Sequence, residues 1–211
     1  ANLFDEGQQK FCKIKLFKSL TIDIKEDSQG NVWFATQGDG LWRLDKNNVW
    51  KQYKHVENDS TSLVSDQVNC LAIGEKGQLY AATSEGLCEF LPSKGIFRRI
   101  SIDAPSQDFT SLVISQGVMW ISTSKGIVKY TPGEPVQLFN KYDGLTCDQF
   151  MPNAGLLTSD GRIYFGSTRG FNCFYPYLVK INAARTGIFI LRPKRCYSQT
   201  TRLASETAQD N

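Results

Sequence analysis

Histidine and closely spaced cysteine are scarce in this sequence. His55 is the single histidine in 211 residues, and no two of the six cysteines form a CxxC pair. Zinc sites need three or four such ligands, so we expect no metal site. A Ser-His-Asp triad would depend on His55 alone, and no G-x-S-x-G motif occurs. We therefore expect a protein that is not an enzyme and that uses no cofactor.

Long apolar runs and a dense cysteine framework are also missing. A membrane-spanning helix needs about 20 apolar residues, whereas the uninterrupted runs here are short, such as IFIL at 188–191. Six cysteines are too few for a disulfide scaffold, and Cys88 and Cys173 are expected to be free thiols that fill strand interiors. The chain opens ANLFDEG, without an initiator methionine or a signal peptide, so we expect a processed or truncated product.

Most of the chain has no continuous field of positive charge. Residues 179–211 contain six basic and two acidic residues, whereas residues 1–178 contain 18 basic and 19 acidic residues. A nucleic-acid or anionic lipid surface needs a basic field. We expect no nucleic-acid binding and no membrane contact by residues 1–178.

One pattern occurs four times in the chain. The segments GNVWFATQGDGLWRL, GQLYAATSEGLCEF, GVMWISTSKGIVKY and GRIYFGSTRGFNCF begin at residues 30, 77, 117 and 161. Each has a turn glycine, a run of β-branched and aromatic residues, a tight turn and a second such run. That order predicts a β-hairpin. The spacings of 47, 40 and 44 residues suit propeller blades and exclude shorter helical repeats.

Additional apolar segments complete each hairpin to a blade. One precedes each hairpin, as in LTIDIKED and VNCLAIGE, and the first three are followed by VWKQY, IFRRI and VQLF. We predict an all-β propeller of about four four-stranded blades and a half blade. The expected bounds are a partial blade at 1–18, blades at about 19–54, 66–100, 108–139 and 149–176, and a divergent or poorly ordered tail at 177–211. The half blade could complete the fourth repeat and close a small ring, but a start in mid-blade favours a piece of a larger propeller.

The aromatic residues divide into two groups. Trp33 and Trp120 occupy one repeat position, where Tyr80 and Tyr164 stand in the other copies. A position that is aromatic in every copy favours packing between blades. Trp42 differs, because cysteine, valine and asparagine stand at its place in the other repeats, so the scaffold does not require it.

Candidate ligand-binding residues lie where the repeats disagree. The hairpin turn carries Asp39, Glu85, Lys125 and Arg169 in the four copies, and a structural requirement would not select two acids and two bases. With Trp42, these are the predicted ligand-binding residues. A solvated turn is the alternative for each of them. The D-x-x-G turns are predicted to be aspartate turns rather than calcium ligands, because the acid is not retained in every copy.

The repeats resemble a known family. DSQGNVWFATQGDGLWRLD at 27–45 is similar to the two-component regulator propeller repeat, and YDGLTCDQFMPNAGLLTSDGRIYFGSTRGFNCFYP at 142–176 resembles the last blade of such propellers. The resemblance covers roughly residues 1–176. It implies a periplasmic sensor region of a bacterial hybrid two-component protein that detects glycan fragments. No kinase, receiver or DNA-binding segment is recognisable in this sequence, so the resemblance implies an input module.

The sequence therefore leaves three hypotheses for the function. The leading one is a non-catalytic sensor propeller that binds a glycan-derived oligosaccharide, with a homodimer possible in the full-length sensor. The second is a protein-interaction or dimerisation propeller without a small-molecule ligand. The third is a propeller hydrolase or lyase, for which the sequence cannot place the two opposed carboxylates.

Overall fold

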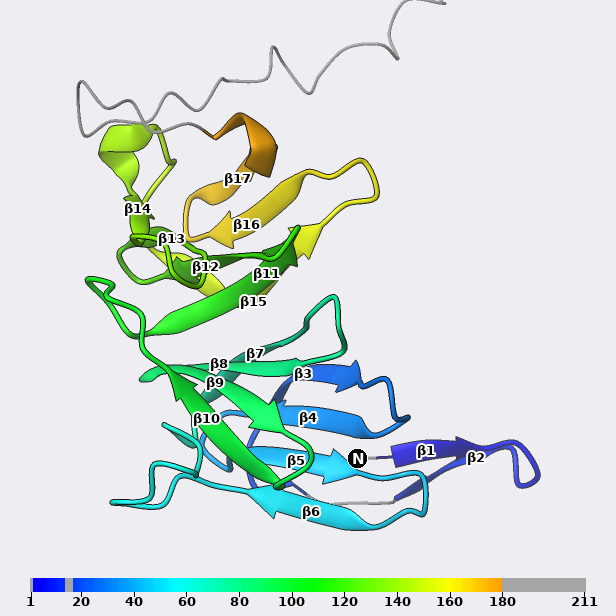
Figure 1. Ribbon diagram of the computed structural model, residues 1–211. Coiled ribbons are helices and arrows are strands. Elements are labelled where there is room, and N and C mark those ends of the chain that lie inside the picture. Colours follow the sequence, from blue (N-terminus) through cyan, green and yellow to red (C-terminus); the bar gives the residue numbers. More distant parts are fainter. Residues whose placement is uncertain (1, 14–16, 180–211) are drawn as a thin grey trace, which may run out of the picture.

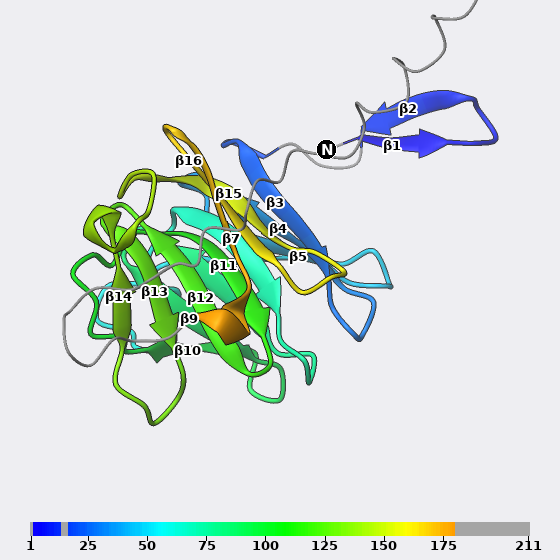
Figure 2. The ribbon, with the colours of Figure 1, turned by 90° about the horizontal axis from the view of Figure 1, so that it is seen from above.

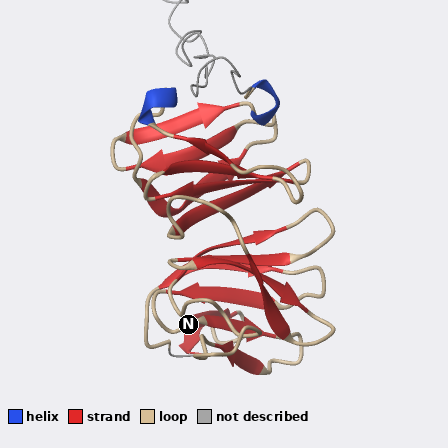
Figure 3. Cartoon of the chain, turned by 60° about the vertical axis from the view of Figure 1, so that its left-hand side comes forward, coloured by secondary structure: helices blue, strands red, loops and turns tan. Residues whose placement is uncertain are grey.

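The computed structural model describes residues 2–13 and 17–179, and within these residues the chain consists of strands and their connecting loops (Figures 1 and 3). The exceptions are two short 3-10 turns, η1 (Lys141–Asp143) and η2 (Pro176–Leu178). None of the helices in this part of the chain is long and apolar enough to cross a bilayer. The predicted tail at 177–211 lies outside the described residues except for 177–179.

Four antiparallel sheets follow one another along the chain, each with its strands in chain order. We call them the first to the fourth blade. The first blade contains β3 (Thr21–Glu26), β4 (Val32–Thr36), β5 (Leu41–Leu44) and β6 (Trp50–Tyr53). The second contains β7 (Val68–Ile73), β8 (Leu79–Thr83), β9 (Gly86–Leu91) and β10 (Ile96–Ile100). The third contains β11 (Phe109–Ser115), β12 (Val118–Thr123), β13 (Gly126–Tyr130) and β14 (Gln137–Phe139). The fourth contains β15 (Phe150–Leu157), β16 (Ile163–Ser167) and β17 (Gly170–Phe174).

The blades fan out from a common line of inner strands, with β3, β7, β11 and β15 at the centre (Figure 1). This arrangement confirms the predicted all-β propeller. Three of the blades have four strands and the fourth has three. The half blade is the separate hairpin of β1 (Asn2–Asp5) and β2 (Lys10–Lys13). It does not pair with β15–β17, and it projects away from the stacked sheets (Figure 2).

Apolar side chains from facing sheets fill the space between successive blades. Residues alternate between the two faces of a strand, so Trp33 and Ala35 of β4 point toward the second blade. Trp33 is fully buried, and its ring lies edge-on to that of Phe90 at a centroid distance of 4.7 Å. Trp120 repeats the arrangement between the third and fourth blades, where its ring centroid lies 4.8 Å from that of Phe174. These contacts confirm that Trp33 and Trp120 pack between blades.

Polar side chains link the inner strands to one another. Each inner strand has a register shift near its start, and a polar residue at or beside the shift bonds to the backbone of another blade. The Asp23 carboxylate accepts the N–H of Leu71 at 2.9 Å, and the Asn69 amide donates to the carbonyl of Phe109 at 3.0 Å. The Ser111 hydroxyl accepts the N–H of Ala154 at 2.7 Å, and the Asn153 amide donates to the carbonyl of Ile22 at 2.9 Å. Asn153 connects the fourth blade back to the first, so the contacts form a circuit around the centre.

Candidate functional site

The four variable residues Asp39, Glu85, Lys125 and Arg169 occupy equivalent turns, because each turn is held by a threonine or serine hydroxyl at the same repeat position. Thr36, Thr83, Thr123 and Ser167 end the second strand of the four blades. Each side chain donates to the carbonyl of a glycine at 2.6 to 3.0 Å. This glycine is the first residue of the third strand in the second, third and fourth blades and directly precedes β5 in the first. In the first three blades the same hydroxyl oxygen accepts the N–H of the variable residue, at 2.9 to 3.2 Å. The scaffold thus fixes the backbone of the turn and leaves its charged side chain free to differ.

Glycine is required in this turn by space as well as by backbone angle. Gly126 has φ of +121°, and a Cβ there would lie 2.1 Å from the carbonyl oxygen of Phe139. Real Cβ atoms do not approach an oxygen that closely. The turn that carries Lys125 is therefore held against β14 by a main-chain contact.

Asp39 and Trp42 come together, but inside the first blade rather than on an open surface. Asp39 is 7% exposed. Its carboxylate accepts from Gln52 at 2.9 Å and from the Trp42 indole at 3.3 Å, and it lies 3.6 Å from the Lys54 ammonium. The ring centroids of Trp42 and Phe17 lie 5.8 Å apart. The side chain of Asp39 is thus occupied by structural contacts. As ligand residues, Asp39 and Trp42 stay a prediction.

Glu85 is placed differently from Asp39. It is exposed at the tip of the second-blade turn, and its backbone N–H is held by Thr83 at 3.2 Å. It does not line the cleft described next, and its role in binding stays a prediction.

Lys125 and Arg169 line one cleft between the third and fourth blades. The cleft has a volume of about 630 Å³, within the range of small-molecule sites. Its wall joins the β12–β13 turn, the β16–β17 turn and the loop that connects the two blades. The lining includes Ser124, Lys125, Lys141, Tyr142, Thr146, Cys147, Asp148, Gln149, Thr168 and Arg169. We call this hollow the rim cleft. It brings together two of the five predicted binding residues.

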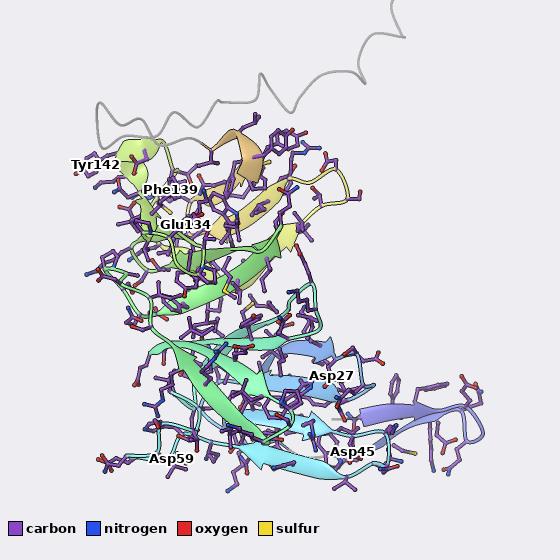
Figure 4. The ribbon with its side chains drawn as sticks, viewed as in Figure 1. Asp27, Asp45, Asp59, Glu134, Phe139 and Tyr142 are labelled. Carbon is purple, nitrogen blue, oxygen red and sulfur yellow. The ribbon has the colours of Figure 1, made fainter. Side chains whose placement is uncertain are left out.

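The connecting loop is preorganised by its own hydrogen bonds. Asn140 caps η1, because its side chain accepts the N–H of Tyr142 at 2.8 Å, while the Asp143 carboxylate accepts the N–H of Asn140 at 2.9 Å. Tyr142 is 83% exposed and points outward from the end of the third blade (Figure 4). The Lys141 ammonium lies 5.1 Å from the centre of its ring. An exposed aromatic face beside a cation thus stands at the cleft.

The same loop contributes a thiol and a carboxylate to the rim cleft. Asp148 accepts the N–H of Lys141 at 2.6 Å, and its carbonyl accepts the N–H of Gly126 at 2.8 Å, which ties the loop to the third blade. Burial raises the pKa of the Cys147 thiol, but hydrogen bonds with Ser167 and Thr168 outweigh it and leave the pKa below its usual value. Cys147 is partly exposed and lines the cleft.

Sequence reasoning missed Lys141, Tyr142 and Cys147 as individual site residues. They lie outside the repeat, so no comparison between copies singles them out. The available signal was the loop itself, NKYDGLTCDQ, which contains two aspartates and an asparagine near a glycine, as capped turns do. Only the structure shows that this loop packs beside both charged turns.

The comparisons with known proteins agree with this architecture. A model of the two component regulator propeller family matches residues 17–38. Histidine kinase P4 of Formosa agariphila is 31% identical over 164 residues, which are 74% of this chain and 12% of that kinase. The chain therefore spans only a small part of the length of this relative.

Solved structures extend the likeness to about four fifths of this chain. The extracellular domain of a hybrid two component system from B. thetaiotaomicron superposes with a TM-score of 0.64 at 19% identity, covering 81% of this chain and 24% of that one. Virginiamycin B lyase from Staphylococcus aureus superposes with a TM-score of 0.55 at 14% identity, covering 80% and 60%. At these identities the likeness concerns the fold, and the fold occurs in an enzyme as well as in a signalling protein.

Stacked antiparallel blades around shared inner strands define the chain as a β-propeller. Its repeats are those of the two component regulator propeller family, as the resemblance in the sequence predicts.

Proposed function

We propose that the chain is a non-catalytic, ligand-sensing propeller module of a hybrid two-component signalling protein, located in the periplasm, and that it binds a glycan-derived oligosaccharide in the rim cleft. The observation that carries the proposal is the composition of this cleft. Hydroxyl, amide and charged groups share it with the exposed ring of Tyr142. Sugars offer many hydroxyls and an apolar ring face, so such a mixture suits them.

The position of the cleft supports a sensing role. Its walls belong to two blades, with Lys125 on the third and Arg169 on the fourth. A ligand that contacts both turns favours one relative placement of the blades over others. Binding therefore shifts the population of the module toward that placement, which is what an input domain must do.

The cleft also favours binding over hydrolysis. Glycoside hydrolysis generally uses a pair of carboxyl groups on opposite sides of the scissile bond. Among the described residues that line the rim cleft, Asp148 is the one carboxylate, and it is engaged by a backbone N–H.

Protection of Cys147 from alkylation tests this function. The chain is treated with iodoacetamide with and without each member of a panel of oligosaccharides, and modification of the Cys147 and Cys173 peptides is measured by mass spectrometry. Cys173 is the control, because it lies on β17 and does not line the cleft. We expect a binding saccharide to slow alkylation at Cys147 only. Saccharide binding by calorimetry without that protection would refute the assignment to this cleft, and product formation would refute the non-catalytic role.

A second candidate is a contact surface for another protein or a second copy of the chain. The outward face of the fourth blade exposes Leu156 (57%) and Phe171 (60%), an apolar surface of the kind that marks interfaces. Sedimentation of the ligand-free protein tests it. A stable dimer that Phe171→Asp dissociates would support a second copy as the partner, and a monomer across the accessible concentration range would remove self-association by this face.

A further inference from the structure

The charge of the rim cleft is one-sided. Three cations reach it from three separate elements: Lys125 from the β12–β13 turn, Lys141 from η1 and Arg169 from the β16–β17 turn. All three are exposed. The one carboxylate in the described lining is Asp148, so the cleft carries two more positive than negative charges.

The three cations are not neutralised by neighbouring acids. Across residues 2–13 and 17–179 the ion pairs involve Lys25, Lys54, Arg98 and Arg162. None of the three cleft cations is among them. The first blade shows the contrast, because there the turn aspartate, Asp39, is paired with Lys54 at 3.6 Å.

The single acid is itself engaged. One oxygen of Asp148 accepts the N–H of Lys141 at 2.6 Å, and the carbonyl of Asp148 is bonded to Gly126. These bonds keep the acid in a structural role within the loop. Among the described residues the Lys125 ammonium and the Arg169 guanidinium form no ion pair. An Arg fork is well suited to bind a carboxylate or sulfate through two parallel hydrogen bonds.

From this arrangement we propose that the rim cleft selects acidic oligosaccharides, with the carboxylate or sulfate ester of the sugar bound between Lys125 and Arg169 and a neighbouring sugar ring against Tyr142. The proposal rests on the function proposed above and adds its substrate class. Lys141 contributes to the field rather than to a specific contact, because its ammonium lies over the Tyr142 ring.

Matched titrations test the charge requirement. The full chain is titrated by calorimetry with trigalacturonic acid, a sulfated galactose trisaccharide and neutral galactotriose at about 0.05 and 0.3 M salt. We expect at least one of the acidic probes to bind at least about tenfold more tightly than the neutral one, since hydrogen bonds to charged groups are stronger than those between neutral groups. The advantage should shrink at high salt, because exposed charges are screened. The two acidic probes distinguish carboxylate from sulfate recognition.

Charge-reversal variants test which side chains provide the preference for acidic sugars. Lys125→Glu and Arg169→Glu should each raise the Kd for the acidic probe by about tenfold or more and leave binding of the neutral probe little changed. Lys94→Glu is the control, because Lys94 is an exposed turn lysine of the second blade outside the cleft. Circular dichroism and melting temperature confirm that the variants are folded.

The outcomes separate this proposal from the function on which it rests. Equal binding of neutral and acidic probes, or equal effects of Lys94→Glu and Arg169→Glu, overturns acidic selectivity while Cys147 protection still supports the cleft. If neutral sugars alone protect Cys147, the selectivity is likewise refuted. If none of the three probes binds and Cys147 is never protected, the saccharide function fails together with its proposed class.

Discussion

Substituting alanine for Gly126 should destabilise the protein more than the same substitution at Gly170. The two glycines open the third strand of adjacent blades, with φ of +121° and +109°. Alanine pays a backbone penalty of about 1–3 kcal/mol at either place. At Gly126 the new Cβ would also lie 2.1 Å from the Phe139 carbonyl oxygen, whereas at Gly170 no atom of the described residues lies within 4 Å of it. Relieving that overlap must move β14 away from β13.

The added loss at Gly126 is expected to be about 1–3 kcal/mol, the usual range for overpacking a rigid site. Urea denaturation followed by tryptophan fluorescence measures both free energies of unfolding, with the denaturant slope as a check on two-state behaviour. Gly126→Ala should in addition weaken ligand binding, because Lys125 is the preceding residue. Equal destabilisation by the two substitutions would refute the role assigned to the main-chain contact with β14.

Three further predictions concern the blade interfaces and the core. Trp33→Phe should lower the free energy of unfolding by about 1.5–3 kcal/mol more than Trp120→Phe, because the Trp33 indole donates to Asp27 at 2.7 Å while the Trp120 nitrogen has no partner among the described atoms. Equal losses in urea melts would contradict this. Asn69→Ala should cost about 1–3 kcal/mol, because it leaves a buried carbonyl of the third blade unpaired. A change below about 0.5 kcal/mol would show that the link between these blades is dispensable. Burial raises the pKa of the Cys70 thiol to about 12 from 9.0, so the buried neutral thiol stabilises the fold fully below pH 9, and this contribution is lost as the pH rises toward 12. Cys70→Ala should therefore reduce the alkaline loss of unfolding free energy by up to about 1.4 kcal/mol per pH unit. The same dependence of unfolding free energy on pH in Cys70→Ala and the original chain would refute this.

The fold was predictable because each blade repeats a local code. Turn residues and alternating apolar residues are readable within a single copy, and the spacing between copies matches the length of one blade. The strands of all four blades lie where this pattern predicts them. The buried Trp33 and Trp120 follow from the same comparison. The circuit of inner-strand contacts was not predictable, because Asp23, Asn69, Ser111 and Asn153 differ in chemistry and act across blades.

The candidate site was predictable only in part. Disagreement between repeats identified Lys125 and Arg169, which line the rim cleft, but the same rule selected Asp39. Its turn is one residue longer, and the aspartate is 7% exposed beside Gln52 and Lys54. Those partners come from another strand, so the sequence of the turn does not reveal them. The loops that connect the other blades, 54–67 and 101–108, differ from 140–149 in length and sequence, so aligning the copies did not single out Lys141, Tyr142 or Cys147.

A crystal structure of the chain with an acidic trisaccharide would show where the ligand binds. We expect the sugar between the β12–β13 and β16–β17 turns, with its anionic group within hydrogen-bond distance of Lys125 and Arg169. A sugar bound instead at the first-blade turn of Asp39, or on the outer face of the fourth blade with the rim cleft empty, would contradict this expectation.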